Sequence, residues 1–595
     1  MPGAGPALLA ATLAFAVLAA WRPAITLALM AAGLPVTAYV SGYAGVRAAW
    51  TEPLVVAALV GWSIRVVLGL ETYAPPADSR RPWTLLGWLI VASAIVELAV
   101  EAIYLASSPW PILRFLYTGY FADRASYPSL GAALLLLEGL ALFAWVSAVT
   151  REEDRWRLVI GMLAVGGAIG AALNLARFIE IARRTGLQAV GHTSTLRVNV
   201  LHGDVNAAAS YFVLILALAC GLALGRRLTA VWITVAGLCA AALWVTGSRT
   251  AIGIAALIGG MVLVAIAWRA TARRVRAVAV MSGLALVAAL AVAYRQYPEK
   301  FTGKPAEEAL RVRKDMWTAG LRMTAAHPWF GIGIGRFYSR SPEFMPSPVA
   351  SEYAHENAHN NFLQVLAELG VAGLAAFIWL LATALIPSRD GPAPSAPMRS
   401  ETGALRIGVV GFLLTCLMGH PLLVREVAYP FWMALGLVAA RTRPLQPLEP
   451  VPGTRRRWVE SGVAVLLIAT VPVRIVQHSR DIDLEEIASG VSTWERDASG
   501  AWVRHVSANA TFYVSGDAPL VEIPLRLTTA GRETTVLIVL DGKPANMIAL
   551  QDDAWRSTRV VLPERPHRRF RRIDLSVEPP ASELVMGRLR YAGWK

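Results

Sequence analysis

The sequence contains few charged residues and few cysteines. Only 16% of its 595 residues are Asp, Glu, Lys or Arg, whereas soluble globular domains average about 25%. Its three cysteines all lie inside apolar stretches, so their spacing supports neither a disulfide framework nor a metal cluster. Basic residues are also missing before Ala7, where a cleavable signal peptide would carry them. These shortages argue against a water-soluble enzyme and predict that the first apolar stretch is retained.

Long apolar stretches take the place of charge. A helix needs about 20 mostly apolar residues to cross a bilayer, and such stretches recur up to about residue 476. They include Trp83–Ala106, Ser129–Thr150, Val205–Leu224, Leu228–Thr246, Ala251–Trp268 and Phe362–Ile386. The sequence therefore predicts a mainly α-helical, multi-pass membrane domain over residues 1–476, with about 12–14 transmembrane helices.

The placement of arginine sets the expected orientation of the chain. The net charge is +15, and arginines gather between apolar stretches at 151–157, 226–227, 269–276 and 455–457. Basic residues concentrate in the cytoplasmic loops of membrane proteins, so these runs predict cytoplasmic loops rather than nucleic-acid binding. By alternation, the segments near 107–128, 176–204, 247–250, 295–359 and 419–428 face the periplasm, as does the tail after about residue 477.

Two long outer loops are rich in arginine, against this trend. The first, at about 176–204, holds Arg197, and the second, at about 295–359, holds Arg313. Topology gives no reason for positive charge there, and a guanidinium group can bind phosphate oxygens in a bidentate way. We therefore expect an anionic ligand on the periplasmic side.

The tail, residues 477–595, changes character. Short stretches rich in β-branched residues, such as Leu520–Leu527 and Thr534–Leu540, are separated by turn signals such as Asp541-Gly542. This pattern predicts an all-β sandwich domain outside the membrane. The domain could contact sugar or acceptor, or it could serve stability alone. Its basic run at 565–572 could bind lipid phosphates or form a solvated loop.

Two clusters on the outer side contain arginine and glycine. Gly247-Ser248-Arg249 forms a turn between two apolar helices. An arginine at the membrane edge is costly unless it is paired or solvated, so Arg249 either binds an anion or anchors the helix end. The second cluster is Arg313 followed by the run His327–Gly335. No strand and helix frame these glycines, so they predict a tight loop rather than a dinucleotide site.

A third cluster opens an apolar helix at its outer end. Within it, His359 could accept a proton from an incoming hydroxyl, because an unperturbed imidazole has a pKa of about 6.5. A histidine that caps the helix is the alternative. His355-Glu356-Asn357-Ala358-His359 also matches H-E-x-x-H, which on a helix would hold zinc. No third ligand is evident nearby, although His420 and Glu426 lie on the same side, so a membrane zinc protease stays a minor alternative.

Taken in order, these clusters resemble the superfamily of O-antigen ligases and polymerases. The matching elements are Arg197 with Asp204 and Asn206, Gly247–Ala251, Arg313 with Trp317, His327–Gly333, and His359–Gln364 with Glu368-Leu369-Gly370. The resemblance implies a fold related to the membrane glycosyltransferases that use polyprenyl donors (glycosyltransferase-C-like). It also implies a place in a bacterial inner membrane, with the active site facing the periplasm.

The resemblance further implies an activity and roles for residues. The activity is a metal-independent, cofactor-free, inverting transfer of glycan from undecaprenyl diphosphate to the hydroxyl of a lipid or glycan acceptor. Arg249 would hold the diphosphate, since preorganised guanidinium groups stabilise a leaving anion without a metal. His359 would be the base, with His355 in reserve. The substrate-binding residues implied are Arg197, Arg313, Ser248, Asn206, Asn360 and His355.

The acceptor and one rival function stay open. Members of the superfamily join glycans to lipid A-core, to another glycan repeat or to protein, and we favour a ligase over a polysaccharide repeat-unit polymerase. A lipid-linked glycan transporter is the alternative from another class, because Arg65, Glu97 and Glu138 lie within apolar segments. No internal repeat supports it.

Overall fold

The computed structural model describes most of the chain. It covers residues 6–37, 50–71, 75–100, 128–186, 204–225, 228–269, 272–296, 304–344, 357–387, 396–441, 454–479, 488–492, 494–497, 499–515, 518–528, 533–563, 570–579 and 583–592. The helices are α1 Pro6–Trp21, α2 Pro23–Gly33, η1 Leu34–Val36, α4 Thr51–Val67, α5 Ala77–Val100, α7 Pro128–Val149, α8 Glu153–Thr185, α9 Val205–Gly225, α10 Thr229–Thr246, α11 Arg249–Arg269, α12 Arg273–Gln296, α14 Lys304–Ala326, α15 Phe337–Phe344, α17 Asn361–Leu385, α18 Ala396–Thr415, η5 Pro421–Leu423, α19 Arg425–Arg441 and α20 Thr454–Ser479.

Six helices in the described part of the chain are long and apolar enough to cross a membrane. These spans are Asp78–Val100, Ser129–Val149, Glu153–Arg184, Val205–Leu224, Thr229–Thr246 and Asn361–Leu385. Three shorter apolar helices accompany them, at Leu8–Trp21, Pro23–Gly33 and Arg249–Val264. The prediction of a mainly α-helical, multi-pass membrane protein is confirmed. The described part of the chain contains six candidate spans, fewer than the about 12–14 transmembrane helices predicted from the sequence.

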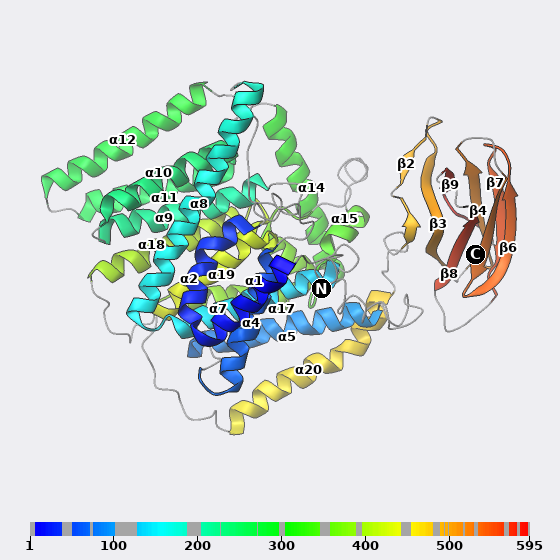
Figure 1. Cartoon of the computed structure of the whole chain (residues 1–595), viewed down its shortest axis with the longest axis horizontal. Coiled ribbons are helices and arrows are strands. Elements are labelled where there is room, and N and C mark those ends of the chain that lie inside the picture. Colours follow the sequence, from blue (N-terminus) through cyan, green and yellow to red (C-terminus); the bar gives the residue numbers. More distant parts are fainter. Residues whose placement is uncertain are drawn as a thin grey trace. The chain divides into compact units, whose positions relative to one another are not determined.

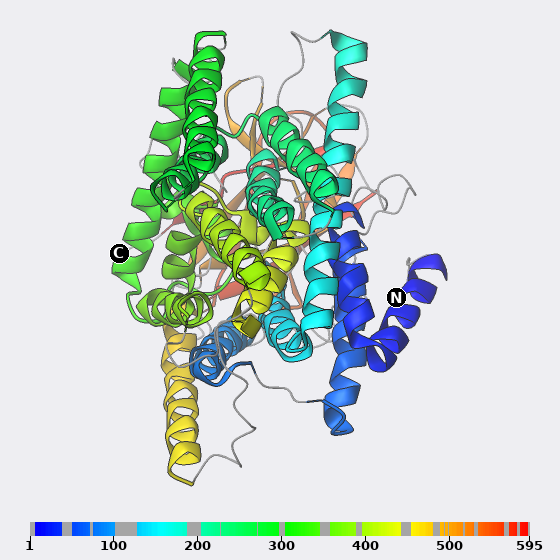
Figure 2. The same cartoon turned by 90° about the vertical axis from the view of Figure 1, so that its left-hand side faces the viewer.

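Helices α9 and α19 form the interior of the helical part. Helix α9 packs between α10 and α18 (Figure 1), and nearly every residue of α19 is buried. Figure 2 shows the yellow-green α18 and α19 surrounded by other helices. Small residues permit this packing: a Cβ atom on Gly408 of α18 would lie 2.7 Å from the carbonyl oxygen of Leu214 in α9. Close approach of backbones is a common basis for helix association in membranes.

Two of the predicted loops contain helices. Helix α8 continues to Thr185, so Arg177 and Arg184 are helical rather than part of an outer loop that begins at 176. Both contact Glu180, at 3.1 Å and 2.8 Å, so their charge has a partner within the helix. The second predicted loop, 295–359, contains α14 and α15.

Charged residues inside the apolar helices have partners. Arg65 donates to the carbonyl oxygen of Ala20 at 2.8 Å and lies 3.5 Å from Glu71. Glu138 accepts a hydrogen bond from Tyr429, and Glu97 is bonded to His478. Since intramembrane charges are tolerated when they are paired, the residues that favoured a transporter have a structural explanation.

The chain divides into two compact units, and the second contains the ends of α5 and α20 together with all of the strands. Its strands are β1 Ser489–Val491, β2 Glu495–Arg496, β3 Trp502–Ser515, β4 Leu520–Leu527, β5 Thr534–Leu540, β6 Lys543–Leu550, β7 Arg556–Val561, β8 Phe570–Glu578, β9 Leu584–Gly587 and β10 Arg590–Ala592. They form one curled antiparallel sheet, in which the long β3 pairs with β9 through its first half and with β8 through its second. The all-β prediction is confirmed.

The basic run predicted at 565–572 ends in a strand rather than in a loop. Arg571 and Arg572 are part of β8, and the Nε atom of each contacts an aspartate: Asp541 at 2.6 Å for Arg571, and Asp574 at 2.7 Å for Arg572. Arg571 is buried. These two arginines therefore stabilise the β-domain, and their charge is neutralised there.

Candidate functional site

Several helix ends meet at one end of the helical unit. The starts of α9 and α11 are joined by side-chain contacts, described below, to the segments just before α17 and around η5, although these parts are far apart in the sequence. All of them belong to segments that the sequence predicts on the periplasmic side. Backbone groups at helix ends lack partners within the helix, so such a meeting of ends provides many donors for a polar site.

A side-chain hydrogen bond fixes the turn before α11. Gly247 ends α10 with a left-handed backbone (φ +67°), and the hydroxyl of Ser248 donates to Oδ1 of Asn206 at 2.9 Å. Asn206 lies in the first turn of α9. Ser248 is buried, whereas Arg249 is exposed. The bond thus holds the turn against α9 and leaves the guanidinium of Arg249 outside.

Arg249 and Arg313, called the arginine pair below, lie near enough for the positive charge of one to act on the other. Arg313, half-buried on α14, has a pKa lowered by burial and, secondarily, by the nearby positive charge of Arg249. Within the part of the chain that the structure describes, neither guanidinium has a hydrogen bond or an ion pair. The two like charges repel each other. The arginine pair is therefore suited to bind an anion such as a phosphate group, which would relieve the repulsion.

His359 lies just before α17 in an unusual backbone conformation. Its φ angle is +47°, in the left-handed region that residues other than glycine rarely adopt. The next residue, Asn360, caps the helix, because its side-chain oxygen accepts a hydrogen bond from the backbone N–H of Leu363 at 3.1 Å. The predicted capping role therefore belongs to Asn360, and the imidazole of His359 projects from a turn ahead of the helix.

A second histidine lies against the first. The rings of His359 and His420 are 4.6 Å apart between centroids and tilted by 58°. Nε2 of His420 lies 3.4 Å from Oδ2 of Asp204. Asp204 precedes α9; burial would raise its pKa, but His420 and the backbone N–H groups of Asn206 and Ala207 lower it below the ordinary 3.8. Asp204 is therefore a carboxylate at neutral pH.

The described part of the H-E-x-x-H match is not helical. Helix α17 begins at Asn361, and His359 is in a left-handed turn ahead of it, whereas His355 lies outside the described residues. Among the described residues, no three His, Cys, Asp or Glu side chains gather as a metal site. The structure therefore gives no support to the zinc protease alternative.

The glycine-rich loop 328–335 is interlocked with α17 at a kink. Gly370 has a non-helical backbone (φ +69°), and the loop supplies hydrogen bonds that the helix loses there. The N–H of Ile332 donates to the carbonyl of Ala367 at 2.9 Å, and the N–H of Val371 donates to the carbonyl of Pro328 at 2.8 Å. In a regular helix, Val371 would bond to Ala367. The loop thus replaces one turn of helical hydrogen bonding.

Only glycine fits at the two points of closest approach in this interlock. A Cβ atom on Gly331 would lie 2.3 Å from the carbonyl carbon of Glu368, and one on Gly370 would lie 2.3 Å from that of Trp329. Both glycines also have positive φ angles. The predicted tight loop is confirmed, but it packs against a helix backbone.

Glu368 supports the same loop through its side chain. Its carboxylate accepts hydrogen bonds from the backbone N–H groups of Gly335 at 2.9 Å and Phe337 at 3.3 Å. Gln364 donates to Glu368 at 3.1 Å and to the side chain of Asn357 at 3.1 Å. Gln364 and Glu368 therefore connect the loop, α15 and the segment before His359.

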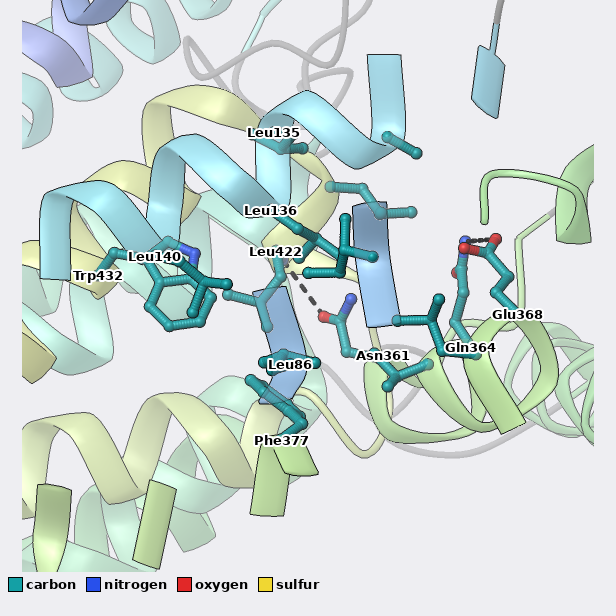
Figure 3. A pocket seen from close by; sticks show the side chains of 15 residues that line it. Leu86, Leu135, Leu136, Leu140, Asn361, Gln364, Glu368, Phe377, Leu422 and Trp432 are labelled. Atoms are coloured by element: carbon teal, nitrogen blue, oxygen red, sulfur yellow. Dashed lines mark hydrogen bonds between the residues drawn. The ribbon is translucent and has the colours of Figure 1, made fainter. Parts of the chain in front are cut away.

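A pocket lined mostly by apolar side chains lies beside this network (Figure 3). Helices α5, α7, α17 and α19 line it, and its polar residues are Asn361, Gln364 and Glu368. The side chain of Asn361 accepts a hydrogen bond from the backbone N–H of Leu422 at 3.2 Å. The pocket therefore adjoins the segment that carries His420, without including His359 or Arg249 in its lining.

The structure brings together part of the predicted site. Asn206 contacts Ser248, Arg249 lies near Arg313, and Asp204 links the Asn206 end to His359 through His420. Arg197 and His355 lie outside the described residues. Sequence reasoning did not assign a role in transfer to His420; its place in a predicted outer segment was the one available signal.

Comparison with known families agrees with this arrangement. Residues 234–378 match the model of the O-antigen ligase family. The matched segment includes Ser248, Arg249, Arg313, His359 and Asn360. The resemblance predicted from the motifs is thus confirmed over these residues. No curated protein matches the chain.

Proposed function

We propose that this chain, which carries an O-antigen ligase domain, transfers a glycan from undecaprenyl diphosphate to an acceptor hydroxyl on the periplasmic face of a bacterial inner membrane. The family match supports glycan ligation or polymerisation at the level of the reaction class. The observation that carries the finer proposal is the arginine pair at the same end of the helical unit as His359. Transfer to a final acceptor, rather than polymerisation, is the form we favour.

The arginine pair is suited to the donor diphosphate. In the reaction, the bond between the anomeric carbon and the diphosphate oxygen breaks, and negative charge grows on the leaving undecaprenyl diphosphate. Fixed guanidinium groups stabilise such charge more in the transition state than in the ground state. Arg249 and Arg313 would form this clamp, and Arg197 would add to it. Ser248 and Asn206, bonded to each other, would position Arg249.

His359 is the proposed base. The acceptor oxygen attacks the anomeric carbon from the side opposite the diphosphate, which inverts the configuration. The hydroxyl proton passes to the imidazole of His359, a group whose ordinary pKa of about 6.5 suits general-base catalysis near neutral pH. The positive charges needed for the leaving group come from arginine side chains, so the proposed reaction is metal-independent. Asn360 would hold the turn, and His355 would be a substrate-binding residue.

The experiment measures the lipid-linked glycan that accumulates when the gene is deleted from its host. Long polymer on undecaprenyl diphosphate supports a ligase, whereas single repeats on the carrier identify a polymerase. Complementation with Arg249→Lys and His359→Ala variants then tests the site. Arg273→Lys in α12 and His505→Ala in β3, both at exposed positions in other elements, serve as matched controls. Full glycan output from both site variants at normal protein levels would contradict the proposal.

A further inference from the structure

We propose that Asp204 and His420 are positioning residues that hold the imidazole of His359 in its reactive orientation. This inference rests on the proposed function and deepens it. His359 alone would contact the acceptor hydroxyl, and the other two residues would act through it. The three side chains come from three separate segments, before α9, before η5 and before α17, so only the fold brings them together.

Asp204 is the fixed end of the arrangement. Its Oδ1 atom accepts hydrogen bonds from the backbone N–H groups of Asn206 and Ala207, both at 2.9 Å, and so caps α9. Its Oδ2 atom faces Nε2 of His420 at 3.4 Å. The side chains of Asp204 and His420 are only 11% and 12% exposed. A carboxylate with one oxygen bonded to a helix end can rotate little, so the other oxygen gives His420 a fixed partner.

The fixed position of His420 restricts His359 through contact between the two rings. The residue before it is a buried glycine, Gly419, and the N–H of Leu423 donates to the His420 carbonyl at 3.0 Å. Both the backbone and the ring of His420 are therefore held. Its ring lies against that of His359 at 4.6 Å between centroids. His359 precedes α17, and the His420 ring restricts the orientation of its side chain from outside that helix.

The charge of Asp204 also suits the proposed reaction. When His359 takes the acceptor proton, a positive charge forms beside His420. The Asp204 carboxylate on the far side of His420 favours that charge, as opposite charges do in a partly buried setting. An orienting carboxylate behind a catalytic imidazole is a recurring catalytic arrangement, although here a second ring stands between them. The reacting geometry matters because a misplacement of about 1 Å can cost about 10²-fold in rate.

The test compares kcat and KM of the purified full-length protein with a lipid-linked glycan donor. Asp204→Asn keeps an oxygen for the helix cap and removes the charge. His420→Phe keeps the ring and removes the bond to Asp204, and His420→Ala removes both. We expect kcat to fall about 10- to 100-fold, least for His420→Phe, while KM for the donor stays within about twofold, since neither side chain lies in the arginine pair. Thermal unfolding of each variant shows whether it is folded.

Coupling between the two residues provides a second readout. If they act in series, Asp204→Asn added to His420→Ala lowers kcat no further, whereas independent effects on folding would add. A rise in donor KM with unchanged kcat would show that the two residues bind donor, and the inference would be wrong. Activity retained in His359→Ala but lost in His420→Ala would make His420 the base, which also overturns it. If variants of both histidines keep full activity, the proposed function itself fails, and the inference fails with it.

Discussion

The imidazole rings of His359 and His420 lie 4.6 Å apart and tilted by 58°, although one residue precedes α17 and the other follows α18. Asp204, at the start of α9, approaches the same pair from a third direction. The geometry around His359 thus depends on three helix ends that no local sequence pattern joins. A substitution at any of these three ends should therefore change the side-chain geometry at the other two.

The arginine pair predicts stabilisation by a phosphate anion. Inorganic pyrophosphate at about ten times its dissociation constant should stabilise the folded protein by about 1.4 kcal/mol, which corresponds to a rise in Tm of about 1–2 °C. The reason is that the anion relieves repulsion between Arg249 and Arg313. Arg313→Gln should reduce the rise strongly, whereas Arg273→Gln should leave it unchanged. Thermal unfolding in detergent measures it, and an equal rise in wild type and Arg313→Gln would contradict the pairing.

The interlock predicts an unusual sensitivity at Gly370. Gly370→Ala forces a Cβ atom to 2.3 Å from the Trp329 backbone and also places alanine at φ +69°. The left-handed backbone alone costs about 1–2 kcal/mol, and the overlap adds to it, so we expect a Tm lower by at least about 1–2 °C or loss of folded protein. Gly403→Ala in α18, where nothing lies within 4 Å of the added atom, is the control. Equal Tm values for the two variants would show that the loop does not pack as described.

The lowered pKa of Asp204 predicts a pH dependence of stability. Because the folded-state pKa lies below the ordinary 3.8, the unfolded chain binds more protons in this range. The contribution of Asp204 to stability is therefore complete above about pH 4 and is lost as the pH falls through the folded-state pKa. Tm measured from about pH 6 to pH 3 should fall more for wild type than for Asp204→Asn. Parallel curves for the two proteins would rule out this contribution.

The β-domain should fold without the membrane helices. Its strands enclose a core of their own, which includes Val514, Ile523 and Ile538, all fully buried. A fragment of residues 488–595 should be soluble, show the circular dichroism of β-strands, and unfold cooperatively. Ile538→Ala should lower its stability by about 2–5 kcal/mol, while Met547→Ala, at an exposed position, should not. A fragment that is disordered alone would contradict the division into units.

Much of the fold could be predicted from hydropathy and β-propensity. Five of the six candidate spans overlap apolar stretches found in the sequence, and the predicted strands 520–527 and 534–540 have the same bounds in the structure. The outer loops were less predictable. Glu180 could pair with Arg177 and Arg184 only because α8 extends to Thr185, and a helix end within a mixed polar and apolar stretch is poorly marked in sequence.

The arginines of the site and His359 could be predicted, because an ionisable residue next to an apolar helix stands out in the sequence. His420 was not, because its importance comes from contacts with Asp204 and His359 across the fold. The roles of Gly331 and Gly370 were partly predictable. The sequence indicated a tight loop, but it could not show that this loop packs against α17. Asn360 likewise turned out to cap the helix.

The interlock also bears on how the protein enters the membrane. Without the loop, the N–H groups of Val371 and Ala372 would lack acceptors near the kink of a membrane-spanning helix, and unsatisfied backbone groups in lipid cost several kcal/mol each. The loop that supplies those acceptors precedes α17 in the chain, so synthesis delivers it before the helix that needs it. Helix α17 therefore reaches its final form by docking onto a segment that has already been synthesised, rather than by inserting as an independent unit.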